Sequence, residues 1–445
     1  MKNLHFKPNC LLKVYTIVSI LSINLVYGQG NKLAIHDLKI KAQESYLTAD
    51  FSKALSYYHK LLKSDSTNSD YNYYIGYCYL KIGSSKSEAT PYFERAILHS
   101  NRKKITISLY YLGVSYMYGH QLDKAIEAFK KYETAVKSNI GEILDANRQI
   151  AMCKNARYFM KYPRKVSITN PGAPLNSTSS DYAPLINIDN SSLVFTSQRK
   201  GSTGGYLNNN GEIYSDIYIS KNNSGTWSKP KKISSIINSV NSETCVFLSG
   251  NSDELIYTKD DIYTNKLLLL SSTKRGKSFA KPTIFDLKYN IKCQANYVFI
   301  TNNGETIFFA SNQKGSCGAN DIWKVTKDST NVWGRQINLG PTVNTPYNEE
   351  APFVTSDGKT LYFSSKGHNS LGGYDLFKSN QTDSGKWSKA VNLEYPINST
   401  GNEIYYNISK DGTKSYFSSD RDGGLGGFDI YIIESKKEIA FKKMH

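Results

Sequence analysis

The chain has 445 residues, of which 39% are hydrophobic and 21% charged, so it can bury two sizeable cores. Its formal net charge is +17, and the basic residues are spread along the sequence in short clusters. Nucleic-acid binding requires a basic stripe on a recognisable module, and the sequence contains neither, so this class of function is excluded. A basic protein of this kind instead suits anionic lipids or polysaccharides.

Residues 1–28 have the pattern of a cleaved secretory signal. Lysines come first, and the run Val14–Val26 that follows them carries no charge. This run is too short to span a bilayer, and Val26 and Gly28 occupy the −3 and −1 positions of a cleavage site before Gln29. An N-terminal membrane anchor is the alternative interpretation. With the signal removed, we expect an exported chain without a transmembrane span.

Residues 32–162 have a helical pattern, with few Gly or Pro and with apolar residues three and four positions apart. Small and aromatic residues recur in it about every 35 positions, close to the period of tetratricopeptide repeats. The pattern resembles that family in three copies, with matching positions at Ala42, Asp50, Phe51, Ala54 and Tyr58, at Ile75, Gly76, Tyr79, Ala89, Phe93 and Ala96, and at Leu109, Leu112, Gly113, Tyr116, Ala125 and Phe129. A last helix over 140–159 would cap the stack. The sequence therefore predicts a tetratricopeptide α-solenoid.

The resemblance also implies a concave surface that binds a partner. The family's concave-face positions fall on Asp70, Tyr73, Tyr77, Ile107, Tyr110, Val114 and Met117. Tyrosine offers a large flat contact area with a polar tip, which suits a peptide groove. The alternative is that these tyrosines pack helix against helix, because the chain has 34 Tyr against 18 Phe and uses Tyr widely.

Residues 165–435 repeat a β-hairpin pattern. In the clearest copy, Asp357 and Gly358 form a turn between two strand-like runs, because both residues tolerate the positive φ of hairpin turns. The second strand of the pattern returns roughly every 54 residues, with an aromatic residue at Phe195, Tyr257, Phe309, Phe363 and Phe417. Such a period with four strand signals in each copy is typical of propeller blades. The sequence predicts a five-bladed β-propeller and, after it, a basic tail at 436–445.

The first and last copies of the pattern complete each other. The last copy ends near Ile433 without a fourth strand, whereas Val166–Ile168 precedes the first copy and matches Val391–Leu393. We expect Val166–Ile168 to be the outer strand of the last blade, because ring closure leaves only short, protected edges. A proline after Tyr162 disfavours helix at that residue and marks the junction between the two domains.

Acidic residues recur at two places of the repeat, each in four of the five copies. One set begins the innermost strand at Asp181, Glu243, Glu350 and Glu403, with Gln294 in the third copy, and the other begins the third strand at Asp216, Asp321, Asp375 and Asp429. A ring of carboxylates around the channel could hold a cation or a basic peptide. A residue repeated in every blade more often serves the blade by accepting backbone hydrogen bonds, and we favour that structural role.

The sequence contains no recognisable catalytic motif. The segment SKNNSGTW at Ser220–Trp227 resembles the Asp-box turn of sialidase-type propellers, which is remote from catalysis. A glycosidase requires two placed carboxylates or an arginine cluster, and no nucleophile elbow or phosphate loop is present. Neither the cysteines nor the seven histidines have the spacing of metal ligands, and whether Cys293 pairs with Cys317 stays open. The sequence therefore predicts no enzyme, no cofactor and no metal.

The whole chain resembles a known family of the bacterial envelope. A signal peptide, a short solenoid and the repeat Ser356-Asp357-Gly358, Leu361–Ser365, Gly372-Gly373 and Asp375-Leu376 are similar to WD40-like propeller proteins of the Bacteroidota, including periplasmic components of type IX secretion and gliding motility. Many relatives continue into an OmpA-like domain that binds peptidoglycan, for which this chain has no room.

The resemblance implies a function and leaves two others open. It implies a non-enzymatic scaffold in the periplasm, associated with the outer membrane, whose solenoid and propeller each bind an envelope protein. A propeller that binds a glycan, peptidoglycan included, at its channel mouth is the first alternative, and a glycosidase is the second. We expect function where the copies differ, in the loop Gly201–Gly211 and around Asp260–Leu270.

Overall fold

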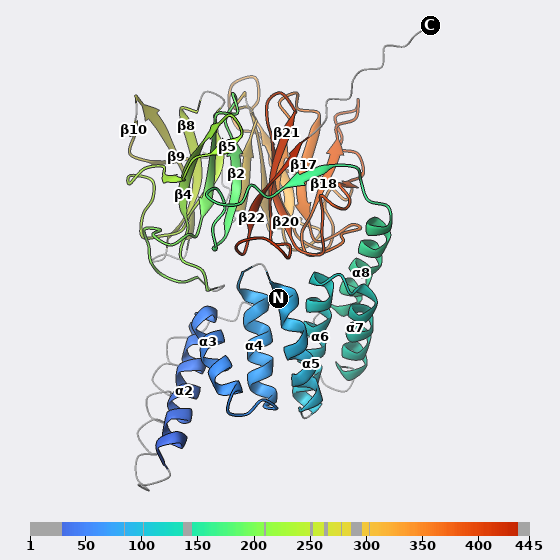
Figure 1. Cartoon of the computed structure of the whole chain (residues 1–445). Coiled ribbons are helices and arrows are strands. Elements are labelled where there is room, and N and C mark those ends of the chain that lie inside the picture. The colour runs from blue at the N-terminus through green and yellow to red at the C-terminus, as the bar shows by residue number, and fades with distance from the viewer. Residues whose placement is uncertain are drawn as a thin grey trace.

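The computed structural model describes residues 29–434 except 84, 101, 137–144, 209–210, 250–251, 262–265, 277, 286–295 and 302. It has a row of helices followed by a β-propeller (Figure 1). The expected signal at 1–28 and basic tail at 436–445 lie outside the described residues. Among the described helices, none is both long and apolar enough to cross a membrane.

Seven α-helices and one short 3-10 helix precede the propeller within the described part of the chain. Their bounds are α2 (Gln29–Leu47), α3 (Phe51–Leu62), α4 (Ser69–Lys81), η1 (Lys86–Ala89), α5 (Thr90–Leu98), α6 (Arg102–Tyr118), α7 (Leu122–Val136) and α8 (Ala146–Lys161). Consecutive helices pack against each other, and glycine allows two of these contacts to be close. A Cβ on Gly76 of α4 would lie 2.9 Å from Phe93 of α5, and one on Gly113 of α6 would lie 2.6 Å from Phe129 of α7.

The propeller has five blades, as the repeat predicts. Blade 1 has β2 (Asp181–Ile186), β3 (Ser192–Ser197), β4 (Asp216–Asn223), β5 (Thr226–Trp227) and β6 (Lys231–Lys232). Blade 2 has β7 (Glu243–Leu248), β8 (Glu254–Asp261), β9 (Lys266–Arg275), β10 (Ser278–Phe279) and β11 (Thr283–Ile284). Blade 3 has β12 (Asn296–Ile300), β13 (Thr306–Ser311), β14 (Asp321–Thr326) and β15 (Ile337–Asn338).

The last two blades follow the same order. Blade 4 has β16 (Glu349–Val354), β17 (Thr360–Ser365), β18 (Asp375–Asn380) and β19 (Val391–Asn392), and blade 5 has β20 (Glu403–Ile408), β21 (Lys414–Ser419) and β22 (Asp429–Glu434). The strand β1 (Ser167–Thr169) pairs antiparallel with β22, Ile168 opposite Ile433, so it lies at the outer edge of blade 5. It starts one residue later than the expected Val166–Ile168.

The aromatic residue of each second strand lies in the cores of the blades. Phe195, Phe309, Phe363 and Phe417 are completely buried, and Tyr257 is 1% exposed. Burying an aromatic side chain of this size stabilises a domain by about 1.5–3 kcal/mol. The repeated aromatic residue is therefore a packing feature of the blade.

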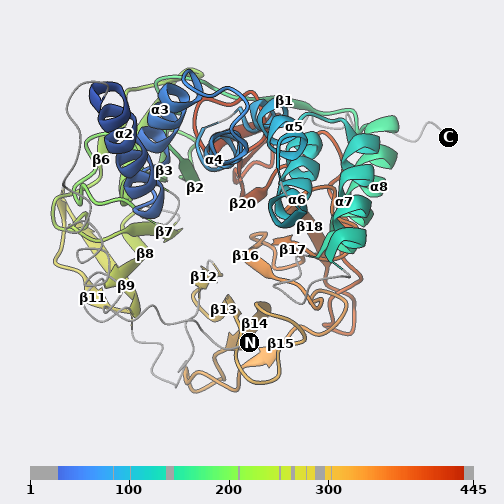
Figure 2. The same cartoon turned by 90° about the horizontal axis from the view of Figure 1, so that it is seen from below.

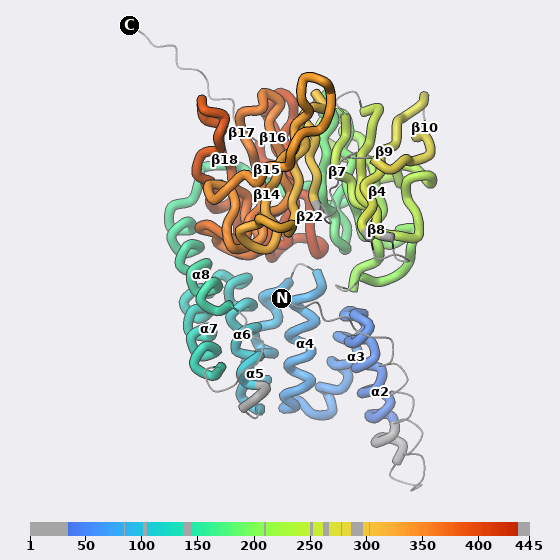
Figure 3. Tube along the Cα trace, turned by 180° about the vertical axis from the view of Figure 1, so that it is seen from behind, coloured from blue at the N-terminus to red at the C-terminus, as the bar shows by residue number. Residues whose placement is uncertain are grey.

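The helices meet one face of the propeller with their ends (Figure 1), and the view from behind shows the same two layers (Figure 3). Seen from below, the row of helices follows one side of the ring of blades (Figure 2). The carboxylate of Asp422 in blade 5 accepts hydrogen bonds from the backbone N–H groups of Lys86 and Ser87, at 2.9 and 3.0 Å. The Lys86 side chain forms a buried ion pair with Asp420.

Further contacts join the domains, among them those of α8 with blade 4. The Arg148 guanidinium of α8 donates hydrogen bonds to the carbonyl oxygens of Lys366, Gly367 and His368 in blade 4, at 2.5, 2.6 and 3.0 Å. The two domains also share an apolar cluster, formed by Leu122, Ala156 and Phe159 of the helices and Leu371 of blade 4. Polar and apolar contacts together hold the helices on blades 4 and 5.

Candidate functional site in the central channel

The inner strands of all five blades are irregular where they line the channel. Each of β2, β7, β12, β16 and β20 shifts register against its neighbour, as at a β-bulge. In four of them the bulge holds a non-glycine residue with positive φ, namely Ala183, Tyr297, Ala351 and Tyr405, with φ between 49° and 62°. Bulges occur beside functional sites, where they redirect a side chain.

Three connected cavities follow the channel. The middle cavity has a volume of about 230 Å³, the upper one, among the hairpin turns, about 500 Å³, and the lower one, beside the helices, about 620 Å³. Tyr297 and Tyr405 line both the middle and the lower cavity, so they form the boundary between the two. Their ring centroids are 5.5 Å apart, and the Tyr405 ring stacks on Tyr182 at 5.8 Å.

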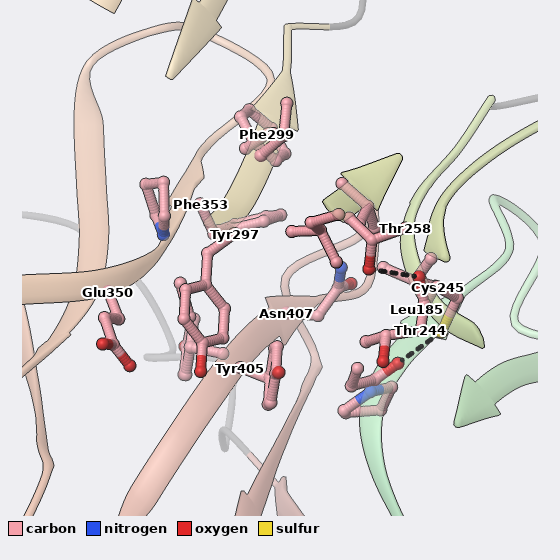
Figure 4. Close-up of a pocket in the computed structure, with 18 of the residues that line it drawn as sticks. Leu185, Thr244, Cys245, Thr258, Tyr297, Phe299, Glu350, Phe353, Tyr405 and Asn407 are labelled. Carbon is pink, nitrogen blue, oxygen red and sulfur yellow. Dashed lines mark hydrogen bonds between the residues drawn. The ribbon is translucent and has the colours of Figure 1, made fainter. Parts of the chain in front are cut away.

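Glu350 provides a buried carboxylate beside these tyrosines (Figure 4). The side chain is 6% exposed, and its Oε1 accepts a hydrogen bond of 2.9 Å from the Asn320 amide. No Lys or Arg of the described residues lies within ion-pair distance of it. A buried carboxylate without a cationic partner costs free energy, and such costs are typical of functional sites.

The hydroxyl groups around Glu350 remain protonated. Burial, and then the Glu350 charge, raise the pKa values of Tyr297 and Tyr374 far above the usual range. The pKa of Tyr405 is raised by burial and by neighbouring groups that include Tyr297 and Glu350. Burial also raises the pKa of Tyr182, to about 12. At neutral pH these four hydroxyl groups are therefore uncharged, and those of Tyr297 and Tyr374 hydrogen-bond Glu350.

A second carboxylate, Asp260, lines the middle cavity from blade 2. Burial raises the pKa of its carboxyl group, although the residue as a whole retains an exposed surface. Apolar residues complete the wall, including Phe299 and Phe353, whose rings lie 5.2 Å apart. The cavity therefore combines aromatic surface with a few polar groups, the usual composition of a small-molecule site.

The repeated acidic residues at the start of the inner strands have another role. Each carboxylate accepts hydrogen bonds from the backbone N–H and the hydroxyl group of the residue four positions earlier. The four pairs are Asp181 with Ser177, Glu243 with Ser239, Glu349 with Thr345, and Glu403 with Ser399. These bonds fix the turn that enters blades 1, 2, 4 and 5.

In blade 4 the acidic residue that fixes the turn is not the one expected from the sequence. Glu349, and not Glu350, is the first residue of β16 and makes the turn contacts, opposite Ser365 in the register. Because successive residues of a strand point to opposite sides, Glu350 then lies in the channel. Thr345, four residues before Glu349, is the signal that identifies the right glutamate, since Glu350 has Pro346 at that position.

The acidic residues at the start of the third strands are also held by backbone groups. Asp321, Asp375 and Asp429 each accept two backbone N–H bonds from the preceding glycine-rich loop and one from an asparagine amide. Asp216 accepts from the N–H and hydroxyl of Thr203 and lies 3.0 Å from the Lys232 ammonium. None of the four lines the three cavities of the channel.

The expected concave-face residues lie among the helix contacts. The Tyr73 and Tyr77 rings are 6.2 Å apart and both contact Tyr111 of α6. Tyr110, Val114 and Met117 pack on the core around Phe129, with Met117 only 3% exposed. Asp70 and Ile107 are half-buried on α4 and α6. Most of these side chains therefore pack helix against helix.

The described residues contain no group of three or more His, Cys, Asp or Glu that could hold a metal ion. Cys317 is an exposed thiol, and its possible partner Cys293 lies outside the described residues. Of the regions where the copies differ, the loop 201–211 reaches the lower cavity at Asn208, and the second blade reaches the middle cavity at Asp260 and Leu267. Sequence reasoning missed Tyr297 and Tyr405, because aromatic residues are common throughout the repeat.

No family model and no curated protein matches this chain. Similar solved structures include an endo-arabinase from Bacteroides thetaiotaomicron, 13% identical with a TM-score of 0.37, which covers 61% of this chain and 99% of its own. An α-L-arabinofuranosidase from Lactobacillus brevis is 10% identical with a TM-score of 0.37, covering 59% of this chain and 91% of its own. A prolyl endopeptidase is 11% identical with a TM-score of 0.29, and the match covers 69% of this chain and 40% of the endopeptidase chain.

These structures correct one expectation from the sequence. We expected no enzyme, yet the solved structures named above are of enzymes, among them an endo-arabinase and an arabinofuranosidase. The sequence-based exclusion of an enzyme is therefore withdrawn.

Proposed function

We propose that the protein binds a carbohydrate in the middle cavity of the propeller channel. The observation that carries the proposal is the pair Tyr297 and Tyr405, whose rings lie beside the buried Glu350 carboxylate. A sugar ring has apolar C–H faces and a rim of hydroxyl groups. Flat aromatic surfaces suit the faces, and a carboxylate with neutral hydroxyl groups suits the rim.

The backbone at these tyrosines supports a functional role. A bulky residue with positive φ costs about 1–3 kcal/mol and is retained where the surrounding structure and function require it. Blades 1 and 4 make the same bulge with Ala183 and Ala351. The blade therefore does not need tyrosine at this position, and the ring itself is the feature to explain.

The proposal predicts that Tyr405→Gly weakens carbohydrate binding at least tenfold. Glycine adopts the positive φ of 62° without strain, so the backbone is retained while the ring is lost. Binding is measured by calorimetry with an oligosaccharide first identified on a glycan array. The matched control is Ala351→Gly, which makes the same change at the same bulge position and removes no ring.

Two results would overturn carbohydrate binding. One is that no oligosaccharide on the array binds the intact chain. The other is that Tyr405→Gly and Ala351→Gly bind the same oligosaccharide as tightly as the unchanged protein.

Glycoside hydrolysis at the same cavity is the second candidate. Glycosidases use two carboxylates in different environments, one of them protonated, and Glu350 and Asp260 line one cavity in different settings. The raised pKa of Asp260 suits a general acid. If hydrolysis occurs, Glu350→Gln and Asp260→Asn each abolish turnover while the bound oligosaccharide is retained. If the unchanged protein releases no sugar from any bound oligosaccharide, this candidate is rejected.

We also infer that the helical domain is a tetratricopeptide solenoid and that the chain is exported to partners in the envelope. The equivalent glycine-to-phenylalanine contacts of Gly76 and Gly113 support the first, and the sequence of residues 1–28 supports the second. Mass spectrometry of the chain from its native cells should find an N-terminus at Gln29. An intact Met1 would contradict cleavage.

A further inference from the structure

The lower cavity is formed by both domains. Its walls include Lys81 and Tyr118 from the helices and Tyr374, Asn402 and Gln198 from the propeller. Tyr297 and Tyr405 line both this cavity and the middle one, so a ligand bound at the tyrosine pair can extend into it. Its volume of about 620 Å³ is within the usual size of a ligand pocket.

Two lysines of this cavity lack a carboxylate partner within ion-pair distance in the described part of the chain. Lys81, at the end of α4, is half-buried beside the Tyr77 ring, with its Nζ 5.4 Å from the ring centroid. Burial and the nearby Lys86 lower its pKa, as expected for an ammonium without a counter-charge. Lys366 is half-buried with its Nζ 4.6 Å from the Tyr374 ring centroid.

The two carboxylates that line the cavity, those of Asp420 and Glu212, already have partners within the protein. Asp420 forms the buried ion pair with Lys86 and accepts hydrogen bonds from Asn402. Glu212 accepts from the backbone N–H and the hydroxyl group of Ser180, at 2.9 and 2.7 Å. Among the side chains that line the cavity, the ammonium groups of Lys81, Lys86 and Lys366 outnumber the carboxylates of Asp420 and Glu212 by one, which suits an anionic group.

We propose that the lower cavity binds the carboxylate of an acidic sugar, so that the ligand of the channel is a glycan containing uronic acid. This inference rests on the proposed carbohydrate binding at Tyr297 and Tyr405. The Lys81 and Lys366 ammonium groups attract the carboxylate, and the polar side chains of Gln198 and Asn402 line the space beside them. The helical domain then contributes directly to recognition, since it supplies Lys81.

The test compares a uronic-acid oligosaccharide with its carboxyl-reduced counterpart of the same length and linkage, using the full chain. We expect the acidic form to bind at least tenfold more tightly, with a preference that falls as salt is raised. Replacing both lysines, Lys81→Gln with Lys366→Gln, should abolish the preference, so that the acidic form binds no more tightly than the neutral form. Lys410→Gln removes an exposed lysine from the upper cavity and should retain the preference.

The outcomes separate this inference from the proposed function. If the neutral form binds as tightly as the acidic one, or if the double lysine variant retains the preference, the acidic-sugar site is rejected while carbohydrate binding stands. If neither form binds and no oligosaccharide on the glycan array binds either, the proposed carbohydrate binding itself is rejected. Thermal unfolding of each variant checks that the fold is retained, and a preference lost equally in Lys410→Gln would contradict the lower site.

Discussion

The carboxylate of Glu349 is completely buried in blade 4 and bonded to Thr345 and Ser365. Burial raises its pKa from 4.5 to about 7. Between these values the folded protein holds a proton that the unfolded chain has released. The free energy of unfolding therefore falls as pH rises through this window, by up to about 3 kcal/mol for this group.

We predict that Glu349→Gln removes this part of the pH dependence. Glutamine can accept from the Thr345 N–H and donate to a hydroxyl group, so the variant should match the unchanged protein at pH 5. At pH 8 it should be the more stable, by about 3 kcal/mol or less. Chemical denaturation at both pH values measures the difference.

The control for this prediction is Asp383→Asn, which neutralises an exposed carboxylate in the same blade. It should leave the difference in stability between pH 5 and pH 8 unchanged. Equal pH dependence of Glu349→Gln and the unchanged protein would show that Glu349 does not titrate in this range.

At the scale of helices, the contact of Gly113 with Phe129 determines how closely α6 and α7 pack. Alanine is the better helix former by about 1 kcal/mol, but its Cβ would lie 2.6 Å from the buried Phe129 ring. Overpacking costs about 1–3 kcal/mol and more where the backbone must shift. We predict that Gly113→Ala lowers the free energy of unfolding by about 1–3 kcal/mol. Urea denaturation measures this change.

A double variant tests the cause of this loss. Phe129→Leu shortens the ring side chain that Gly113→Ala would meet, so the two changes together should cost less than the sum of their separate costs. Additive costs would mean that the Gly113 effect arises within α6 and does not depend on α7.

At the scale of the molecule, the Lys86–Asp420 pair links the helices to the propeller. Lys86 is 7% exposed, with its Nζ also 4.7 Å from the Tyr118 ring centroid. We predict that Lys86→Met lowers the free energy of unfolding by about 3–5 kcal/mol, because it leaves Asp420 buried without a counter-charge. Scanning calorimetry should then show the helices unfolding before the propeller.

Removing both charges is the control for this prediction. Lys86→Met with Asp420→Asn leaves no unpaired buried charge, so it should cost less than Lys86→Met alone. A single transition at the original temperature in Lys86→Met would show that Arg148 and the Leu371 cluster hold the domains without this pair.

The sequence by itself determined the features that depend on local chemistry and on repetition. An Asp-Gly turn such as Asp357-Gly358 requires only its own backbone preference, and a strand pattern repeated five times predicts five blades. In blades 1, 2 and 5 the acidic residue that fixes the turn was also predicted from the sequence, because its partner lies only four positions away.

The candidate site depends on how the blades and helices pack together. Tyr297, Glu350, Tyr405 and Asp260 come from four different blades and meet because the ring closes. Lys81 reaches the same channel only because Arg148 and Lys86 hold the helices on blades 4 and 5. Contacts between residues so far apart in the chain depend on the packing of whole domains, and no local pattern of sequence encodes them.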